Sequence, residues 1–159
     1  MKAVYPGTFD PPTCGHLDVL KRASRIFDRL IVAVARASNK NTLFTYEERK
    51  EMLCEEISSL DNVEVVSFEG LLVKFVKSVD ASVIVRGLRA ISDFEYEFQM
   101  SLMNRRLAGE LDTIFLFTKD EYSYLSSRLV KEIADLGGDV SDMVPPGVKT
   151  RLLARLKGK

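Results

Sequence analysis

The 159-residue sequence contains only one histidine, His16, and two cysteines, Cys14 and Cys54. Two cysteines cannot build a disulfide framework or a cluster of metal ligands, so their number favours a reduced, cytosolic protein. Cys14 lies close to His16, but no second histidine exists to activate it as a nucleophile. The sequence therefore gives no support to a catalytic role for Cys14.

The chain also lacks an excess of charge of either sign. Lys and Arg number 23, Asp and Glu number 23, and the formal net charge is zero. This balance does not indicate a nucleic-acid partner or an anionic membrane surface. No apolar run approaches the roughly 18 residues of a membrane span, and the first residues enter a strand pattern without the features of a signal peptide. We expect neither a nucleic-acid nor a membrane partner.

Apolar patterning predicts the fold. Hydrophobic residues make up 46% of the chain, enough for a core, and the length suits one domain, since domains run to roughly 100–200 residues. Short apolar runs alternate with segments of helical spacing. We predict an α/β protein in which residues 1–159 form a single Rossmann-like domain, with a five-stranded parallel sheet covered by helices on both faces. The expected strands are 3–5, 30–35, 63–68, 83–85 and 113–117, and the expected helices begin near residues 16, 45, 71, 93, 126 and 147.

Residues 3–16 are the segment around which the chain is organised. The apolar run 3–5 predicts a buried strand, and residues 6–12 contain three prolines and a glycine that can continue neither strand nor helix. A helical pattern then opens at His16, so its free N–H groups face the end of the strand. An α/β sheet builds anion sites at this position. The fingerprint G-x-G-x-x-G is absent here, which argues against a dinucleotide cofactor.

Polar side chains recur just after the predicted strands, where the ligands of such sheets bind. Cationic groups, hydroxyls and helix N-termini on one rim suit a polyphosphate. Each has an ordinary structural alternative: His16 as a helix cap, residues 86–89 as a basic turn paired with Asp93 and Glu95, and the serines as N-caps. The functional interpretation depends on their joint placement. The candidates are Thr8, Asp10, His16, Lys40, Gly70, Leu71, Leu72, Arg86, Arg89, Tyr122, Ser126, Ser127 and Arg128.

The sequence offers no pair of carboxylates placed for acid–base hydrolysis and no Ser–His–Asp set. Positioning and charge stabilisation remain, and they suffice for transfer at phosphorus. A phosphate held in line with the α-phosphate of a nucleoside triphosphate needs no covalent enzyme intermediate. His16, backed by a helix N-terminus, is the best-placed donor for the charge that develops.

Five separated motifs carry a resemblance to a known family. Residues 7–16 (GTFDPPTCGH) resemble the [T/H]-x-G-H signature of the nucleotidylyltransferase superfamily. The remaining motifs are similar to those of bacterial phosphopantetheine adenylyltransferases, with matching spacing along essentially the whole chain. They are RGLR at 86–89, DFEYE at 93–97, MNR at 103–105 and YLSS at 124–127.

The resemblance implies a reaction of ATP with 4′-phosphopantetheine, in the presence of Mg²⁺, giving dephospho-coenzyme A and pyrophosphate. It implies that His16 stabilises the transition state, that the protein is a homohexamer, and that coenzyme A inhibits it; it leaves the metal ligands unknown. Hexamer contacts would bear on the last helix and on residues 93–107. The implied ATP-binding residues are Thr8, Phe9, His16, Gly87, Leu88, Arg89, Glu97, Tyr122, Ser123, Tyr124, Leu125, Ser126, Ser127 and Arg128. The implied phosphopantetheine-binding residues are Thr8, Lys40, Leu72 and Arg86.

Two positions depart from the family pattern. Arg128 follows the two serines where a serine or threonine is usual, so its contact with the adenylate is an open question. Cys14 stands at a variable position where asparagine is frequent, which makes sensitivity to thiol reagents an expectation. The alternatives to this assignment are a nicotinamide mononucleotide or glycerol-phosphate nucleotidylyltransferase, and a nucleotide-binding sensor without turnover. The RGLR segment and the full-length match argue against the first two, and the intact set of cationic residues argues against the sensor.

Overall fold

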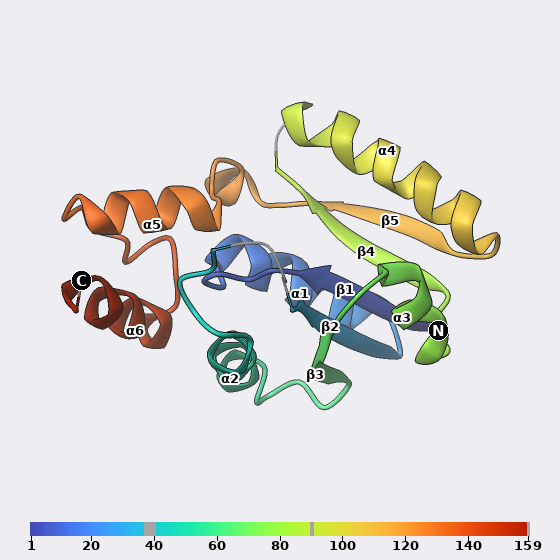
Figure 1. Ribbon diagram of the computed structural model, residues 1–159, viewed down its shortest axis with the longest axis horizontal. Coiled ribbons are helices and arrows are strands. Elements are labelled where there is room, and N and C mark those ends of the chain that lie inside the picture. The colour runs from blue at the N-terminus through green and yellow to red at the C-terminus, as the bar shows by residue number, and fades with distance from the viewer. Residues whose placement is uncertain (37–40, 90, 159) are drawn as a thin grey trace.

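The computed structural model describes residues 1–36, 41–89 and 91–158, which form a parallel sheet with helices on both faces (Figure 1). The strand order is β3-β2-β1-β4-β5, with β1 in the centre. The chain therefore builds the sheet outward from β1 in one direction and then, from β4, in the other. The predicted fold class is confirmed. The strands are β1 Lys2–Gly7, β2 Arg29–Ala35, β3 Val63–Phe68, β4 Val83–Leu88 and β5 Asp112–Phe117.

Helices cover the sheet because its side chains alternate between two apolar faces. Tyr5 and Val85 point to the side covered by α1 and α2, whereas Val4 and Ile84 point to the side covered by α3 and α4. Helices α5 and α6 pack together beyond the carboxyl ends of the strands (Figure 1). The helices are α1 Cys14–Ile26, α2 Tyr46–Glu56, α3 Leu72–Ser78, α4 Ile91–Ala108, α5 Ser127–Asp135 and α6 Pro146–Lys157, with a 3-10 turn at Asp120–Tyr122.

Helix starts follow local sequence signals. The Thr45 hydroxyl accepts a hydrogen bond from the N–H of Glu48, whose carboxylate accepts in return from the N–H of Thr45, at 3.3 and 2.8 Å. This capping box begins α2 one residue after Thr45, as the sequence predicts. Among the described residues, no helix combines the length and the apolar character needed to cross a membrane.

Strand β4 is longer than its apolar run. The sequence predicted a strand ending at Val85 and a basic turn at 86–89, but Arg86 pairs with Phe115 and Leu88 with Phe117 in the ladder to β5. The predicted turn is wrong. The backbone ladder to β5 carries the strand through Arg86, and its guanidinium forms a close ion pair with Glu97 of α4. Only Arg89 follows the strand.

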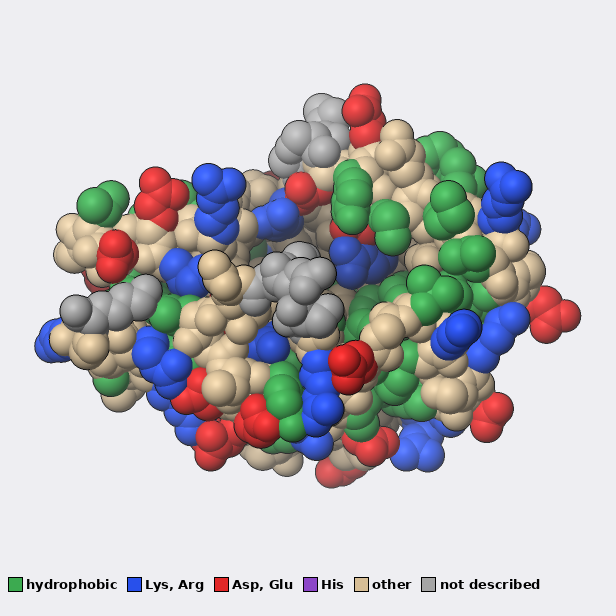
Figure 2. Space-filling view, viewed as in Figure 1, with side chains coloured by type: hydrophobic (Ala, Val, Ile, Leu, Met, Phe, Trp, Pro, Cys, Tyr) green, Lys and Arg blue, Asp and Glu red, His purple; other side chains and the backbone are tan. Residues whose placement is uncertain are grey.

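Helix α4 has its polar side turned toward the molecule. Asn104 is buried and Glu97 is largely buried, whereas Phe94, Phe98, Leu102 and Met103 are between 46 and 53% exposed. We call these four residues the α4 apolar surface; Figure 2 shows hydrophobic side chains gathered over this helix. The four residues share one face of α4, as the sequence predicts, but this face is exposed to solvent.

Candidate active site

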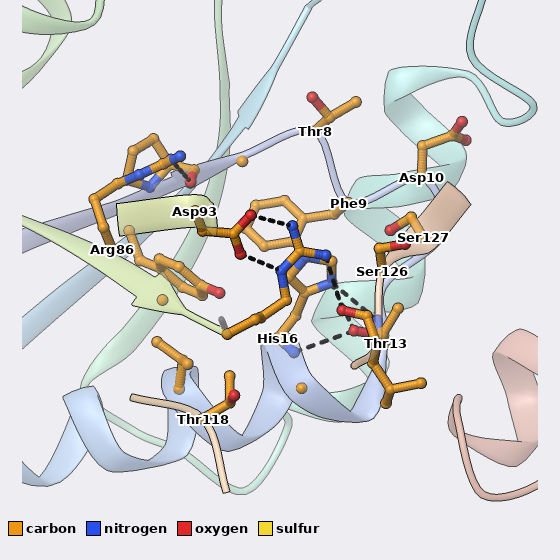
Figure 3. Close-up of a pocket in the computed structure, with 18 of the residues that line it drawn as sticks. Thr8, Phe9, Asp10, Thr13, His16, Arg86, Asp93, Thr118, Ser126 and Ser127 are labelled. Atoms are coloured by element: carbon orange, nitrogen blue, oxygen red, sulfur yellow. Dashed lines mark hydrogen bonds and ion pairs between the residues drawn. The ribbon is translucent and has the colours of Figure 1, made fainter. Parts of the chain in front are cut away.

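A cavity of about 580 Å³ lies at the carboxyl ends of β1 and β4, where the strand order reverses. Doubly wound sheets bind their ligands at such a point. The cavity is lined by the loop after β1, the start of α1, the end of β4, the first turns of α4 and the start of α5 (Figure 3). With residues 41–42 and Thr118, which also line the cavity, five stretches far apart in the sequence meet at one site: 5–19, 41–42, 86–97, 118 and 125–131.

Phe9 shapes the loop that follows β1. Its backbone has a φ of 52°, and its ring is buried over Gly7, where an added Cβ would come within 2.7 Å of the ring. The same ring makes edge contacts with the rings of Tyr5 and His16, at centroid distances of 5.4 and 5.1 Å. The aromatic packing fixes where the His16 imidazole stands at the start of α1.

The imidazole of His16 is held in one tautomer. Its Nδ1 accepts a hydrogen bond from the backbone N–H of Thr13 at 3.0 Å and lies 3.1 Å from the Thr13 hydroxyl. Burial, together with the positive charges of Arg89 and Arg86, lowers the pKa of His16 to about 4. The ring is therefore neutral at pH 7 with its proton on Nε2, and His16 lines the cavity as a neutral donor. Its predicted role as part of the helix cap is also confirmed, because Thr13 and His16 form a capping box.

Two arginines of the β4 end are oriented by carboxylates of α4. Arg86 pairs through Nε with Glu97 at 2.6 Å and donates to the Pro6 carbonyl at 3.0 Å. Arg89 pairs through Nε with Asp93 at 2.9 Å and donates to the Leu125 carbonyl at 2.9 Å (Figure 3). Of the two pairings that the sequence offered for the 86–89 segment, the one with Asp93 is confirmed, whereas Glu97 stands in place of Glu95 as the second partner. Both guanidiniums are fixed before any ligand binds.

The start of α5 closes the cavity opposite α1. Ser126 caps the helix by accepting a hydrogen bond from the N–H of Leu129 at 3.1 Å, and Ser127 donates to the Pro11 carbonyl at 2.7 Å. Lys131, one turn later, pairs with the carboxylate of Asp10 at 2.8 Å. The α5 wall is therefore tied at two points to the loop that carries the first motif.

Comparison with known proteins places this arrangement in a family. Residues 4–133 match the cytidylyltransferase-like family. The chain is 55% identical over 150 residues to the phosphopantetheine adenylyltransferase of Heliobacterium modesticaldum, covering 94% of this chain and 89% of that protein. It is 55% identical over 153 residues to that of Moorella thermoacetica, covering 96% of each. This chain belongs to the phosphopantetheine adenylyltransferase family. It is accordingly a nucleotidyltransferase.

The fold is shared more widely than the family. A solved structure from Vibrio parahaemolyticus, provisionally assigned as a nicotinate-nucleotide adenylyltransferase, superposes with a TM-score of 0.71 at 22% identity, covering 98% of this chain and 93% of that one. At this level of identity the comparison supports the doubly wound fold alone. The assignment to the phosphopantetheine adenylyltransferase family depends on the sequence relatives.

Most residues implied by the resemblance to phosphopantetheine adenylyltransferases meet at the cavity. Leu72 instead lines a second cavity of about 90 Å³, which shares Arg86 and Glu97 with the first. Lys40 lies outside the described residues. Leu88, Tyr122, Ser123, Tyr124 and Arg128 do not line the main cavity among the residues described, and Arg128 is exposed. Those that do line it are Thr8, Phe9, His16, Arg86, Gly87, Arg89, Glu97, Leu125, Ser126 and Ser127.

The cavity also contains polar residues that the sequence reasoning did not assign to it. Lys131 lies four residues after Ser127, so helical spacing from the second motif could have placed it on the same side of α5. The sequence indicates Asp93 only as a partner of the basic segment 86–89. No local pattern marks Asn41, Thr42 or Thr118 as lining residues. These additional lining residues include Asn41, Thr42, Asp93, Thr118 and Lys131, and Thr13 and Tyr96, which belong to the recognised motifs, line the cavity as well.

The described residues show no ready-made cage for a metal ion. They contain no group of three histidine, cysteine or acidic side chains that could hold one. The three carboxylates that line the cavity are Asp10, Asp93 and Glu97, and each is paired with a lysine or an arginine. A cation such as Mg²⁺, which is commonly bound in part by substrate phosphates, would depend on those phosphates here.

Proposed function

We propose that this chain transfers the adenylyl group of ATP to 4′-phosphopantetheine, giving dephospho-coenzyme A and pyrophosphate. The observation that carries the proposal is the neutral His16 donor, held in a cavity between the arginines of β4 and the start of α5. The relatives named for this activity, at 55% identity over nearly the full chain, support the choice of substrates.

In this reaction an oxygen of the phosphopantetheine phosphate attacks the α-phosphorus of ATP. A new P–O bond forms to that phosphorus, and the bond to the β-phosphate oxygen breaks, leaving its electron pair on pyrophosphate. Negative charge on the oxygens around the α-phosphorus needs donors that are already in place. His16 supplies Nε2–H, and Arg89 supplies a fixed positive charge; neither has to change its protonation state.

The division of the cavity between the two substrates follows the family resemblance. The ATP side comprises the α5 start, Gly87, Leu88, Arg89 and Glu97, with residues 122–128 as the outer segment. To the acceptor the resemblance assigns Thr8 and Arg86 of the main cavity, Leu72 of the second cavity, and Lys40, which lies outside the described residues. The two sides meet at Thr8 and His16. Arg86 and Glu97 form one ion pair, so the sites assigned to the two substrates share a structural element.

Mg²⁺ belongs to this proposal as a companion of ATP. Because the acidic residues of the cavity are already paired with cations, we propose that the metal enters with the triphosphate and is held mainly by it. It would neutralise phosphate charge there. No step is assigned to a metal bound by protein side chains alone.

The first prediction concerns the acceptor. With ATP and Mg²⁺, we expect pyrophosphate release with 4′-phosphopantetheine, and at most background release with nicotinamide mononucleotide or glycerol 3-phosphate. A coupled assay for pyrophosphate measures this directly, and excess EDTA should abolish the signal. Release with another acceptor would preserve the adenylyl-transfer chemistry but contradict the substrate. ATP binding without turnover on any acceptor would instead favour the nucleotide-binding sensor.

The second prediction concerns assembly. We propose that the protein forms a homohexamer and that the α4 apolar surface is one of its contacts, because four large hydrophobic side chains there are about half exposed. Exposed apolar patches of this kind mark interaction sites. Light scattering of the purified protein should give a mass near six times 17.9 kDa. Phe98→Asp should lower that mass, whereas Leu136→Asp, at an 81% exposed position after α5, should not. A monomeric parent protein would contradict the proposal.

Two further properties are proposed from the family resemblance. Coenzyme A, which shares the phosphopantetheine moiety of the acceptor, is proposed as a feedback inhibitor. The cytoplasm is proposed as the location, in keeping with two cysteines that form no framework.

A further inference from the structure

The carboxylate of Asp10 is a buried junction between three segments. Asp10 is only 4% exposed. Its two oxygens accept hydrogen bonds from the backbone N–H groups of Leu43 and Phe44, both at 2.9 Å, and from the ammonium of Lys131 at 2.8 Å. Burying a carboxylate is costly unless it is paired and hydrogen-bonded, and these three donors meet that requirement.

The segments joined at Asp10 are walls of the cavity. Asn41 and Thr42 line it immediately before the two bonded amides, and Lys131 lines it from α5. Asp10 itself belongs to the first motif, six residues before His16. One side chain therefore connects the segment that carries the proposed transition-state donor with two neighbouring walls of the cavity.

Arg49 also connects the 43–45 segment with the first motif. It is 2% exposed and donates to the carbonyls of Phe44, Thr45 and Ala35 at 3.2, 3.2 and 3.1 Å, and to the carbonyl of Thr8 at 2.5 Å. Asp10 thus binds the N–H groups and Arg49 the carbonyl groups of adjoining peptides. Residues 43–45 are held from both sides against the first motif.

We propose that Asp10 is a positioning residue for the reaction: it holds the wall formed by residues 41–44 in register with His16 and with α5. The naming of the substrates depends on the proposed function, and the contacts themselves do not. The 41–44 wall directly follows Lys40 in the sequence, and the family resemblance assigns Lys40 to phosphopantetheine, so we place this wall on the acceptor side. In-line attack requires the acceptor phosphate to be placed accurately, since a displacement of about 1 Å can cost about 10²-fold in rate.

Asp10→Asn is the most informative variant, because it preserves the size of the side chain and removes one acceptor oxygen. The new amide NH₂ would face either a backbone N–H or the Lys131 ammonium, so two donors would oppose each other. We expect hydrogen exchange at the amides of Leu43 and Phe44 to become at least about ten-fold faster, as measured by NMR or mass spectrometry of the whole protein. This measurement needs no substrate.

The kinetic expectation is a split between the two substrates. We expect Asp10→Asn to lower kcat/KM for 4′-phosphopantetheine by about 10²-fold, while the equilibrium affinity for ATP changes by less than about three-fold. Lys131→Met should leave the two amides protected, because Asp10 then still accepts from both of them. The Lys131→Met variant therefore tests the contact of Asp10 with α5 separately from its contacts with Leu43 and Phe44.

Asp18→Asn is the matched control. The Asp18 side chain is 6% exposed, accepts from the N–H of Lys119 at 3.2 Å and lies beside Arg22, but it does not line the cavity among the described residues. We expect its kcat/KM to stay within about two-fold of the parent. Unchanged exchange at residues 43–44 in Asp10→Asn would overturn the proposal. So would a loss of activity that merely follows the unfolded fraction and affects both substrates equally. A parent protein that shows no turnover with 4′-phosphopantetheine, although amide exchange at residues 43–44 is faster in Asp10→Asn, would contradict the proposed function. That outcome would leave the positioning of the 41–44 wall by Asp10 supported.

Discussion

Replacement of His16 by alanine is expected to lower kcat by about 10²–10³-fold, which corresponds to about 2.7–4 kcal/mol of transition-state stabilisation. The reason is that Thr13 holds Nδ1 and so orients the ring, which leaves Nε2–H to donate to the phosphate oxygens. Their additional negative charge exists only during the transfer. The affinity for ATP, measured by calorimetry, should change much less than kcat. Equal losses in rate and in ground-state affinity would make His16 a binding residue instead.

The protonation state of His16 provides a check that needs no variant. The lowered pKa, about 4, means that the ring gains a proton only below that pH and is neutral throughout the range from 5 to 8. The parent enzyme should therefore show no change in kcat attributable to His16 across that range. A limb near pH 6.5 that disappears in His16→Ala would show that the imidazole titrates, and would contradict its role as a neutral donor.

Replacement of Arg49 by methionine is expected to lower the free energy of unfolding by roughly 3–5 kcal/mol, because several buried carbonyls would lose a donor and each unsatisfied group costs about 1–3 kcal/mol. Methionine fills a similar volume but removes the guanidinium donor from the carbonyls of Thr8, Ala35, Phe44 and Thr45, of which Thr45 keeps the helical hydrogen bond from the Arg49 backbone N–H. Burial lowers the pKa of Arg49, but the guanidinium stays charged at neutral pH. Urea denaturation measures the loss, and Tm should fall by about 2–4 °C per kcal/mol.

The control for this stability effect is Arg29→Met. Arg29 has 66% of its side chain exposed and forms a loose pair with Glu64 at 3.7 Å. Exposed pairs of this kind contribute roughly 0–1 kcal/mol, so this variant should unfold close to the parent. A loss below about 1 kcal/mol in Arg49→Met, comparable with the control, would mean that water or local rearrangement satisfies the four carbonyls.

Much of the fold is determined by short-range patterns. The apolar run 30–35 has to be a strand covered on both faces, and the Thr45 capping box starts α2 at the expected residue. The alternation of such elements leads to a parallel sheet, whose carboxyl ends gather the polar residues that follow the strands. The positions of Thr8, His16, Arg89 and the α5 start could therefore be predicted from the sequence. The family to which the chain belongs could be predicted from its motifs alone.

Long-range pairing of charges could not be predicted in the same way. The sequence allows Arg86 to begin a basic turn, but β4 continues through it, and its guanidinium pairs with Glu97, eleven residues further along the chain. The same ion pairs turn the polar side of α4 inward, so its aromatic residues face outward although their spacing resembles that of a core helix.

The Asp10 junction has the same physical origin. Asp10 and Lys131 lie 121 positions apart, and no local pattern connects them. The sequence by itself determined which segments become strands and helices, because that choice depends on neighbours a few residues away. The tertiary structure decided which buried charge meets which partner. A buried charge needs a partner because its desolvation is costly, and the order of the strands determines which side chains lie close to it.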